Sequence, residues 1–212
     1  MFSALRRNPG IFVAGSLLLL ALVGLLAEWD RYPSDRTPEG AYLRIVSGVN
    51  RGQPQELFAY IELGAQHACF SISDYRRRSQ KLVERDYPPA LRAAVLLPYQ
   101  AEAATTDGPE LFEVYARNHA WIERLSRDLS GIAEVVVEGE RATIVTARGT
   151  RYPFRRRPNG IWGLTWFTAT LQLDAEKAAR DYSLIESSAA DYRRTRSAVS
   201  DGGGAQPRAV AP

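Results

Sequence analysis

Residues 133–171 read AEVVVEGERATIVTARGTRYPFRRRPNGIWGLTWFTATL, and this stretch decides the fold. Apolar and polar residues alternate along it, and a period of two is typical of β-strands with one buried face. Turn sequences that contain glycine interrupt the alternation at residues 139–140, 148–150 and 158–160. The stretch therefore predicts an antiparallel meander of four strands, at residues 133–138, 141–147, 151–156 and 161–171.

The last turn predicts how the third and fourth strands pair. Asn159-Gly160 is a residue pair that two-residue hairpin turns prefer. Such a turn would place Arg157 opposite Trp162, Arg155 opposite Leu164, and Pro153 opposite Trp166. The other face, beneath the helices, would then hold the core residues Tyr152, Phe154 and Phe167.

This register would create an apolar surface edged by arginines, formed by Arg155, Arg157, Trp162, Leu164 and Trp166. Aromatic and arginine side chains are enriched at the energetic centres of protein interfaces. The surface would be covered either by a helix after Asp174 or by a second subunit or partner. A shift of one residue would exchange the two faces.

Helical spacing of apolar residues predicts the elements before and after the sheet. Thr37 is suited to cap the first helix, and Pro38 to its first turn. Gly131 is placed to end the helix that begins at Asp107. The predicted helices comprise residues 38–50, 54–61, 66–85, 107–129 and 174–194. Several helices packed on a meander, with a further C-terminal helix, make an α+β fold.

Two segments resemble a known family. Residues 37–41, TPEGA, and residues 50–57, NRGQPQEL, resemble the opening of nuclear-transport-factor-2-like domains, and the later hairpins look like that family's curved sheet. The resemblance covers residues 37–171 and implies a cone with a pocket between helices and sheet. The long helix after the last strand departs from the family's usual ending. Members include enzymes, ligand binders and membrane-anchored scaffolds of secretion machines, so the fold alone assigns no activity.

An uncharged segment precedes this domain. Residues 11–27 read IFVAGSLLLLALVGLLA, and as a helix at ~1.5 Å per residue they would span about 26 Å. That length predicts a single-pass transmembrane anchor. A cleaved signal peptide is the alternative, but its apolar run would be shorter, and bulky Leu25 would occupy the −3 position for cleavage after Ala27.

Charges at the two ends of this segment predict its orientation. Arg6 and Arg7 precede it while Glu28 and Asp30 follow it, and basic flanks stay cytoplasmic. We therefore expect the chain in a bacterial inner membrane with its C-terminal domain in the periplasm. Its parts would be a cytoplasmic N-terminus (1–10), the anchor (11–27), a linker (28–36), an extracytoplasmic domain (37–196) and a disordered tail (197–212).

The charge balance argues against nucleic acid as a partner. From residue 28 onward the chain carries 25 basic and 24 acidic residues. A nucleic-acid-binding domain would instead carry a broad positive field. Two arginine triplets, residues 76–78 and 155–157, are interpreted as solvated, ion-paired faces, with contact to acidic lipids or an acidic partner as the functional alternative.

Few residues suggest catalysis or metal binding. His67 and Cys69 are two residues apart, so on a helix their side chains would point in different directions. We interpret Cys69 as buried, and His67 and His119 as structural or surface residues. Glu134 and Glu138 share a strand face, interpreted as the solvent face. No spacing of cysteines and histidines predicts a metal site, and no cofactor is expected.

These observations favour a non-catalytic binding or scaffolding domain. The expected partners are the lipid bilayer, through the N-terminal helix, and a protein or a second copy of the chain. The alternative is a pocket-containing enzyme or small-ligand carrier of the nuclear-transport-factor-2-like type. A buried Asp–His pair at the floor of a pocket would support that alternative.

Overall fold

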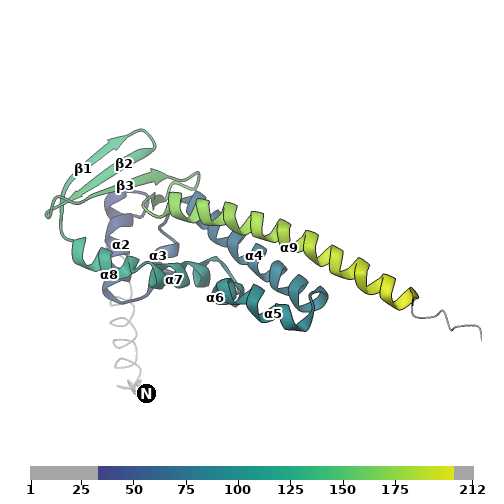
Figure 1. Cartoon of the computed structure of the whole chain (residues 1–212). Coiled ribbons are helices and arrows are strands. Elements are labelled where there is room, and N and C mark those ends of the chain that lie inside the picture. Colours follow the sequence, from purple (N-terminus) through teal and green to yellow (C-terminus); the bar gives the residue numbers. More distant parts are fainter. Residues whose placement is uncertain (1–32, 203–212) are drawn as a thin grey trace, which may run out of the picture.

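The computed structural model describes residues 33–202, which form an α+β fold (Figure 1). Helices come first, a four-stranded antiparallel sheet follows, and a long C-terminal helix ends the described chain. This agrees with the predicted fold class. The predicted anchor, residues 11–27, lies outside the described residues. None of the helices within residues 33–202 is long and apolar enough to cross a membrane.

The first three helices follow the predicted boundaries closely. α2 (Pro38–Asn50) is capped as predicted, because Thr37 Oγ1 accepts a hydrogen bond from the backbone nitrogen of Gly40 at 3.1 Å. α3 spans Pro54–Phe58, and α4 spans Leu63–Asp86. The region after α4 is also helical, which the sequence pattern did not predict. It forms α5 (Pro89–Leu96), the 3-10 turn η1 (Leu97–Tyr99) and α6 (Gln100–Ala103).

The single helix predicted over residues 107–129 is in fact two helices. α7 (Gly108–Asn118) and α8 (Trp121–Asp128) meet at Ala120, whose φ of 52° is left-handed. The break allows the Trp121 ring to enter the core, where its centroid lies 4.7 Å from that of Phe167. Gly131 does not take the predicted left-handed conformation, because α8 ends on Leu129 in extended geometry and the chain continues into the sheet.

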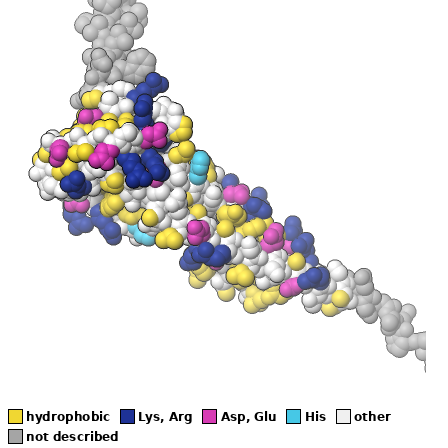
Figure 2. Space-filling model, turned by 90° about the horizontal axis from the view of Figure 1, so that it is seen from above, with side chains coloured by type: hydrophobic (Ala, Val, Ile, Leu, Met, Phe, Trp, Pro, Cys, Tyr) yellow, Lys and Arg dark blue, Asp and Glu magenta, His cyan; other side chains and the backbone are white. Residues whose placement is uncertain are grey.

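The sheet contains β1 (Ile132–Glu138), β2 (Arg141–Thr146), β3 (Arg151–Arg156) and β4 (Trp162–Leu164), in that order. Its inner face packs on α2, and its residues Ile144, Tyr152 and Phe154 belong to one core that also includes Trp121 and Leu125 of α8. Figure 2 views the molecule from the side of the sheet and shows basic and acidic side chains together on that end. The first three strands and their turns are as the sequence predicts.

The pairing of β3 with β4 differs by one residue from the predicted register. Phe154 pairs with Leu164, Arg155 with Gly163, and Arg156 with Trp162. The turn is a three-residue loop, in which Gly160 N donates to Arg157 O and Gly160 has a φ of 85°. Pro158 explains the difference, because it has no N–H with which to close a two-residue turn and its fixed φ suits a type I turn. Trp162 and Leu164 therefore face the core.

The predicted fourth strand over residues 161–171 ends at Leu164. Helix α9 spans Thr168–Gly202, so it begins before Asp174 and continues past its predicted end at Arg194. Leu171, Ala178 and Ile185 are buried at helical spacing, and this packing overrides the strand-like alternation before Asp174. Residues 197–202, predicted as part of a disordered tail, are helical; the rest of that tail lies outside the described residues.

α9 lies alongside α4, and the two helices run in the same direction (Figure 1). Contacts advance in the same order along both: Gly64 with Gln172, Arg78 with Tyr182, and Asp86 with Arg196. A second apolar cluster, around Val83, Tyr87 and Ile185, fills the far end of this helical region. The described part of the chain is therefore elongated, with the sheet at one end.

Candidate functional site

The five residues of the predicted interaction surface do not share one face. Trp162 and Leu164 are 4% and 1% exposed and belong to the core, whereas Trp166 is 39% exposed. Arg155 lies on the other face of the sheet, and its Nη1 donates to Glu62 Oε1 at 3.0 Å. Arg157 donates to the backbone oxygen of Ile61. The one-residue shift in register separates these side chains.

The chain itself covers the tryptophan and leucine of β4. Trp162 Nε1 donates to the backbone oxygen of Arg36 at 3.1 Å, and Leu164 N donates to that of Tyr60 at 2.8 Å. Ile61 forms a parallel bridge to Leu164. The predicted cover, a C-terminal helix or a partner, does not apply to these two side chains because they face the core. The segment that precedes α2 bonds the Trp162 indole, and the segment that precedes α4 pairs with the edge of β4.

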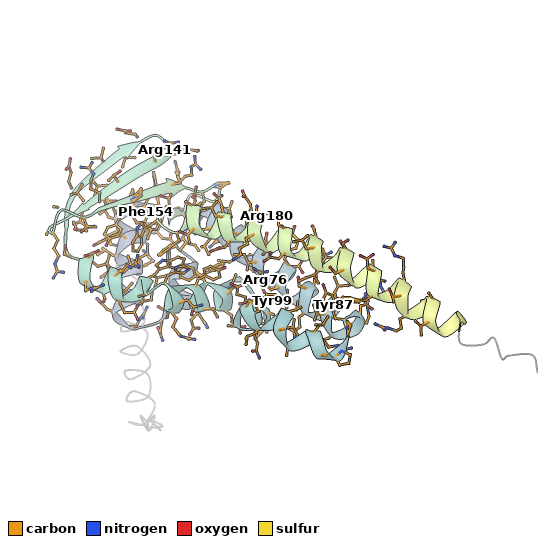
Figure 3. The ribbon with its side chains drawn as sticks, viewed as in Figure 1. Arg76, Tyr87, Tyr99, Arg141, Phe154 and Arg180 are labelled. Carbon is orange, nitrogen blue, oxygen red and sulfur yellow. The ribbon has the colours of Figure 1, made fainter. Side chains whose placement is uncertain are left out.

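A cluster of charge, with Arg76 of α4 buried at its centre and two partly exposed carboxylates around it, lies in the helical region (Figure 3). The Arg76 side chain is 7% exposed, and it bonds two carboxylates: Nε donates to Glu102 at 2.8 Å and Nη1 donates to Asp181 at 2.7 Å. Its guanidinium carbon lies 4.8 Å from the centroid of the Tyr99 ring. Burial lowers the pKa of Arg76, but the two carboxylates together outweigh burial and raise it. Arg76 therefore stays charged.

A pocket of about 340 Å³ opens beside this cluster, between α9 and the segment of η1 and α6. Its volume falls within the range of small-molecule sites. Leu184, also in its lining, is 69% exposed. We call it the Arg76 pocket; its lining comprises Arg76, Pro98, Tyr99, Glu102, Tyr115, Asp174, Lys177, Asp181, Leu184 and Ile185.

The phenols of this pocket stay protonated near neutral pH. Burial raises the pKa of Tyr99 to about 12. Burial, and secondly the Glu102 carboxylate, raise the pKa of Tyr115, whose hydroxyl donates to Glu102 Oε1 at 3.1 Å. General acid–base catalysis favours a group that titrates near the working pH. Arg76 and these two tyrosines are thus suited to hold a ligand and not to exchange protons with it.

Two charged side chains of the pocket lining remain available to a ligand. Asp174 and Lys177, one turn apart on α9, form no hydrogen bond or ion pair within residues 33–202. Leu184 lies two turns farther along the same helix. A bound molecule could therefore meet an acidic, a basic and an apolar contact along one side of the pocket.

The first arginine triplet, residues 76–78, divides between burial and the surface. Arg76 is buried, whereas Arg78 pairs with Asp74 at 3.5 Å and donates to the Tyr182 hydroxyl at 2.7 Å. Ion pairing is confirmed for both, but Arg76 is not on a solvated face. The sequence offered no signal for this, because Arg76 and Asp181 are 105 residues apart along the chain.

The cysteine and histidines lie as the sequence predicts. Cys69 is fully buried, and burial raises the pKa of its thiol to about 12. His67 and His119 are exposed, and the His119 ring stacks on Trp121 at 5.0 Å between centroids. Glu134 and Glu138 are exposed on the sheet. Across the described residues, no three histidine, cysteine or acidic side chains are grouped to hold a metal ion.

A second pocket, of about 410 Å³, lies at the far end of α4 and α9, and Asp86, Arg92 and Arg196 are among its lining residues. Asp86 pairs with Arg85 at 2.8 Å and with Arg193 at 3.4 Å. The Arg85 hydrogen bond, above all, lowers the pKa of Asp86. Asp86, Arg92 and Arg196 are all bonded within the chain, whereas Asp174 and Lys177 of the Arg76 pocket are not, so we assign the Arg76 pocket as the candidate site.

Comparisons of the chain with protein-family models, with curated proteins and with solved structures gave no match.

Proposed function

We propose that the chain is a single-pass membrane-anchored, extracytoplasmic domain that binds or scaffolds another molecule without catalysis, with the Arg76 pocket as its binding site. One observation carries the proposal. The pocket joins a fixed cluster of charge around Arg76 to Asp174 and Lys177, which form no hydrogen bond or ion pair in the described part of the chain. In ligand sites, a small number of polar groups in fixed positions sets the orientation of the ligand, and charged groups that are not already bonded can contact it.

The membrane anchor is supported by the apolar segment at residues 11–27 and by the arginines that precede it. A periplasm-dependent reporter fused after Pro212 should be active, and carbonate extraction should leave the protein in the membrane fraction. An inactive reporter on a stably expressed fusion would contradict the orientation. Release into the supernatant would instead indicate cleavage.

Site-specific crosslinking tests the pocket as the binding site. A photoreactive amino acid in place of Leu184 should crosslink a partner in native membranes, because that side chain is 69% exposed in the lining of the pocket. The matched control is the same substitution at Ser183, which is exposed on α9 but does not line the pocket. A discrete crosslinked species is expected from position 184 and not from position 183. Equal crosslinking from both positions would contradict the proposal.

The second candidate function is a small-ligand carrier or enzyme of the nuclear-transport-factor-2-like type. It is favoured by the pocket volume of about 340 Å³ and by the order of helices before an antiparallel meander. Native mass spectrometry of the full chain released from detergent distinguishes the two. A carrier would retain a small molecule of defined mass, and Leu184→Arg would remove that added mass.

A further inference from the structure

The two edges of the sheet differ: the β4 edge is paired with another segment of the chain, and the β1 edge is not paired within the described residues. At the β4 edge, Leu164 exchanges backbone hydrogen bonds with Tyr60 and Glu62. At the opposite edge is β1, with which no strand other than β2 pairs within the described residues. Figure 1 shows β1 on the side of the sheet away from α9. A free strand edge is a template for another strand.

The register identifies the backbone groups that point outward from β1. Thr146 N donates to Thr150 O, and Arg156 N donates to Glu140 O, so the even-numbered residues of β2 bond β3. The odd-numbered residues of β2 must then bond β1, where they pair with Glu134, Val136 and Glu138. The N–H and C=O groups of Val135 and Val137 consequently point to the free edge.

The side chains along this edge have two chemical characters. On the outer face, Glu134 and Glu138 are exposed, and Glu140 follows in the turn. In the described part of the chain, none of these three carboxylates forms an ion pair or a side-chain hydrogen bond. On the inner face, Val137 is 54% exposed and lies next to the half-buried Val135. The outer face thus carries these carboxylates, with Val136 between Glu134 and Glu138 and with Arg141 of β2 paired opposite Glu138, whereas the inner face is apolar.

From this edge we infer that β1 accepts an extended segment of another protein, in which basic residues alternate with apolar ones. The backbone of that strand would bond the outward groups of Val135 and Val137. Its basic side chains would lie beside Glu134 and Glu138, and its apolar side chains beside Val137. Opposite charges on neighbouring strands stabilise their pairing, and strand addition to a sheet edge is a known mode of peptide recognition.

Charge favours this occupant over a second copy of the chain. A second copy could pair its β1 antiparallel with this β1 through the outward N–H and C=O groups of Val135 and Val137. Every such register brings glutamates of the two copies together. Glu134 or Glu138 meets a glutamate of the other copy either directly or diagonally across the strands. Like charges in those positions oppose pairing. The inference concerns a different surface from the Arg76 pocket and stands independently of the function proposed for it.

Synthetic peptides test the inference on the full chain in a non-ionic detergent. The probes are labelled peptides of four Lys-Val repeats, four Glu-Val repeats and four Lys-Pro repeats, the last of which keeps the charge but cannot form a strand. Fluorescence anisotropy should show the Lys-Val peptide binding at least about tenfold more tightly than either of the others. Equal binding of the Lys-Val and Glu-Val peptides would overturn the inference.

Two variants locate the binding on β1. Val137→Pro removes an outward N–H without removing a bond to β2, and it should weaken Lys-Val binding at least about tenfold, whereas Val137→Thr should leave it within about twofold. Glu134→Gln with Glu138→Gln, both at exposed positions, should reduce the preference for Lys-Val over Glu-Val to below about threefold. Circular dichroism checks that each variant is folded.

Two further results would overturn the inference. The first is Lys-Val binding that a folded Val137→Pro variant or the double glutamine variant leaves unchanged. The second is a dimer that forms without peptide and dissociates on Val137→Pro, since a second copy would then occupy the edge.

Discussion

Ala120 shows how one residue can take a conformation that its own preference opposes. Alanine is the best helix former, so the sequence predicts a continuous helix through this position. The left-handed φ of 52° costs an L-amino acid about 1–2 kcal/mol. Packing of the neighbouring Trp121, which is 6% exposed and contacts Phe112 and Phe167, offsets this cost. Helix propensity could not predict this break, because the break is caused by tertiary packing of Trp121.

Ala120→Gly should raise the free energy of unfolding by about 1 kcal/mol, because glycine adopts a positive φ without steric cost. Urea denaturation of the purified chain measures the change. The matched control is Ala116→Gly, within α7 and fully buried, which should lower the free energy of unfolding by about 1 kcal/mol or more. A glycine at position 120 that destabilises the protein would show that Ala120 is not strained.

At the scale of elements, signals that act within a few residues predicted helix starts and turns well. Features that depend on packing between distant residues were not predicted. Thr37 and Pro38 mark the start of α2, and the turn at residues 139–140 marks the first hairpin, because each signal acts within a few residues. The turn at residues 158–160 contains two competing signals, Pro158 and Asn159-Gly160, and the proline decides the loop length. That single residue of difference places Trp162 and Leu164 in the core, whereas Trp166 remains partly exposed.

Paired substitutions in two tryptophans test the observed register. Trp162→Glu should lower the free energy of unfolding by more than about 3 kcal/mol, because it buries a carboxylate in place of a core ring. Trp166→Glu should cost about 1 kcal/mol, since that ring is 39% exposed. Urea unfolding followed by circular dichroism measures both. Similar small losses in the two variants would favour the register with both rings outside.

At the scale of the whole molecule, Arg76 joins elements that are remote in sequence. It bonds α6 across 26 residues and α9 across 105 residues. A buried arginine with two carboxylates has no short sequence signature, since the partners come together only in the folded chain. The α+β fold class and the order of helices and strands could therefore be predicted from the sequence, but the candidate site could not.

Arg76→Met should lower the free energy of unfolding at neutral pH by about 3 kcal/mol, because it leaves two carboxylates without their cation. Combining it with Glu102→Gln and Asp181→Asn should recover more than half of that loss, since those side chains would no longer be charged. Urea unfolding of the single and combined variants measures both values. A combined variant less stable than Arg76→Met would show that the carboxylates have other stabilising roles.

The parallel course of α4 and α9 has an electrostatic consequence for the end of the molecule away from the sheet. Peptide dipoles of parallel helices add, whereas those of antiparallel neighbours largely cancel, and each helix end carries about half an elementary charge. Both negative ends therefore lie toward the same tip, where Asp86 contributes a further negative charge. Arg85, Arg193 and Arg196 meet at this aspartate through its side chain or backbone. These guanidinium groups thus lie at the C-terminal end of α4, where they offset the negative charge of Asp86 and of that helix end.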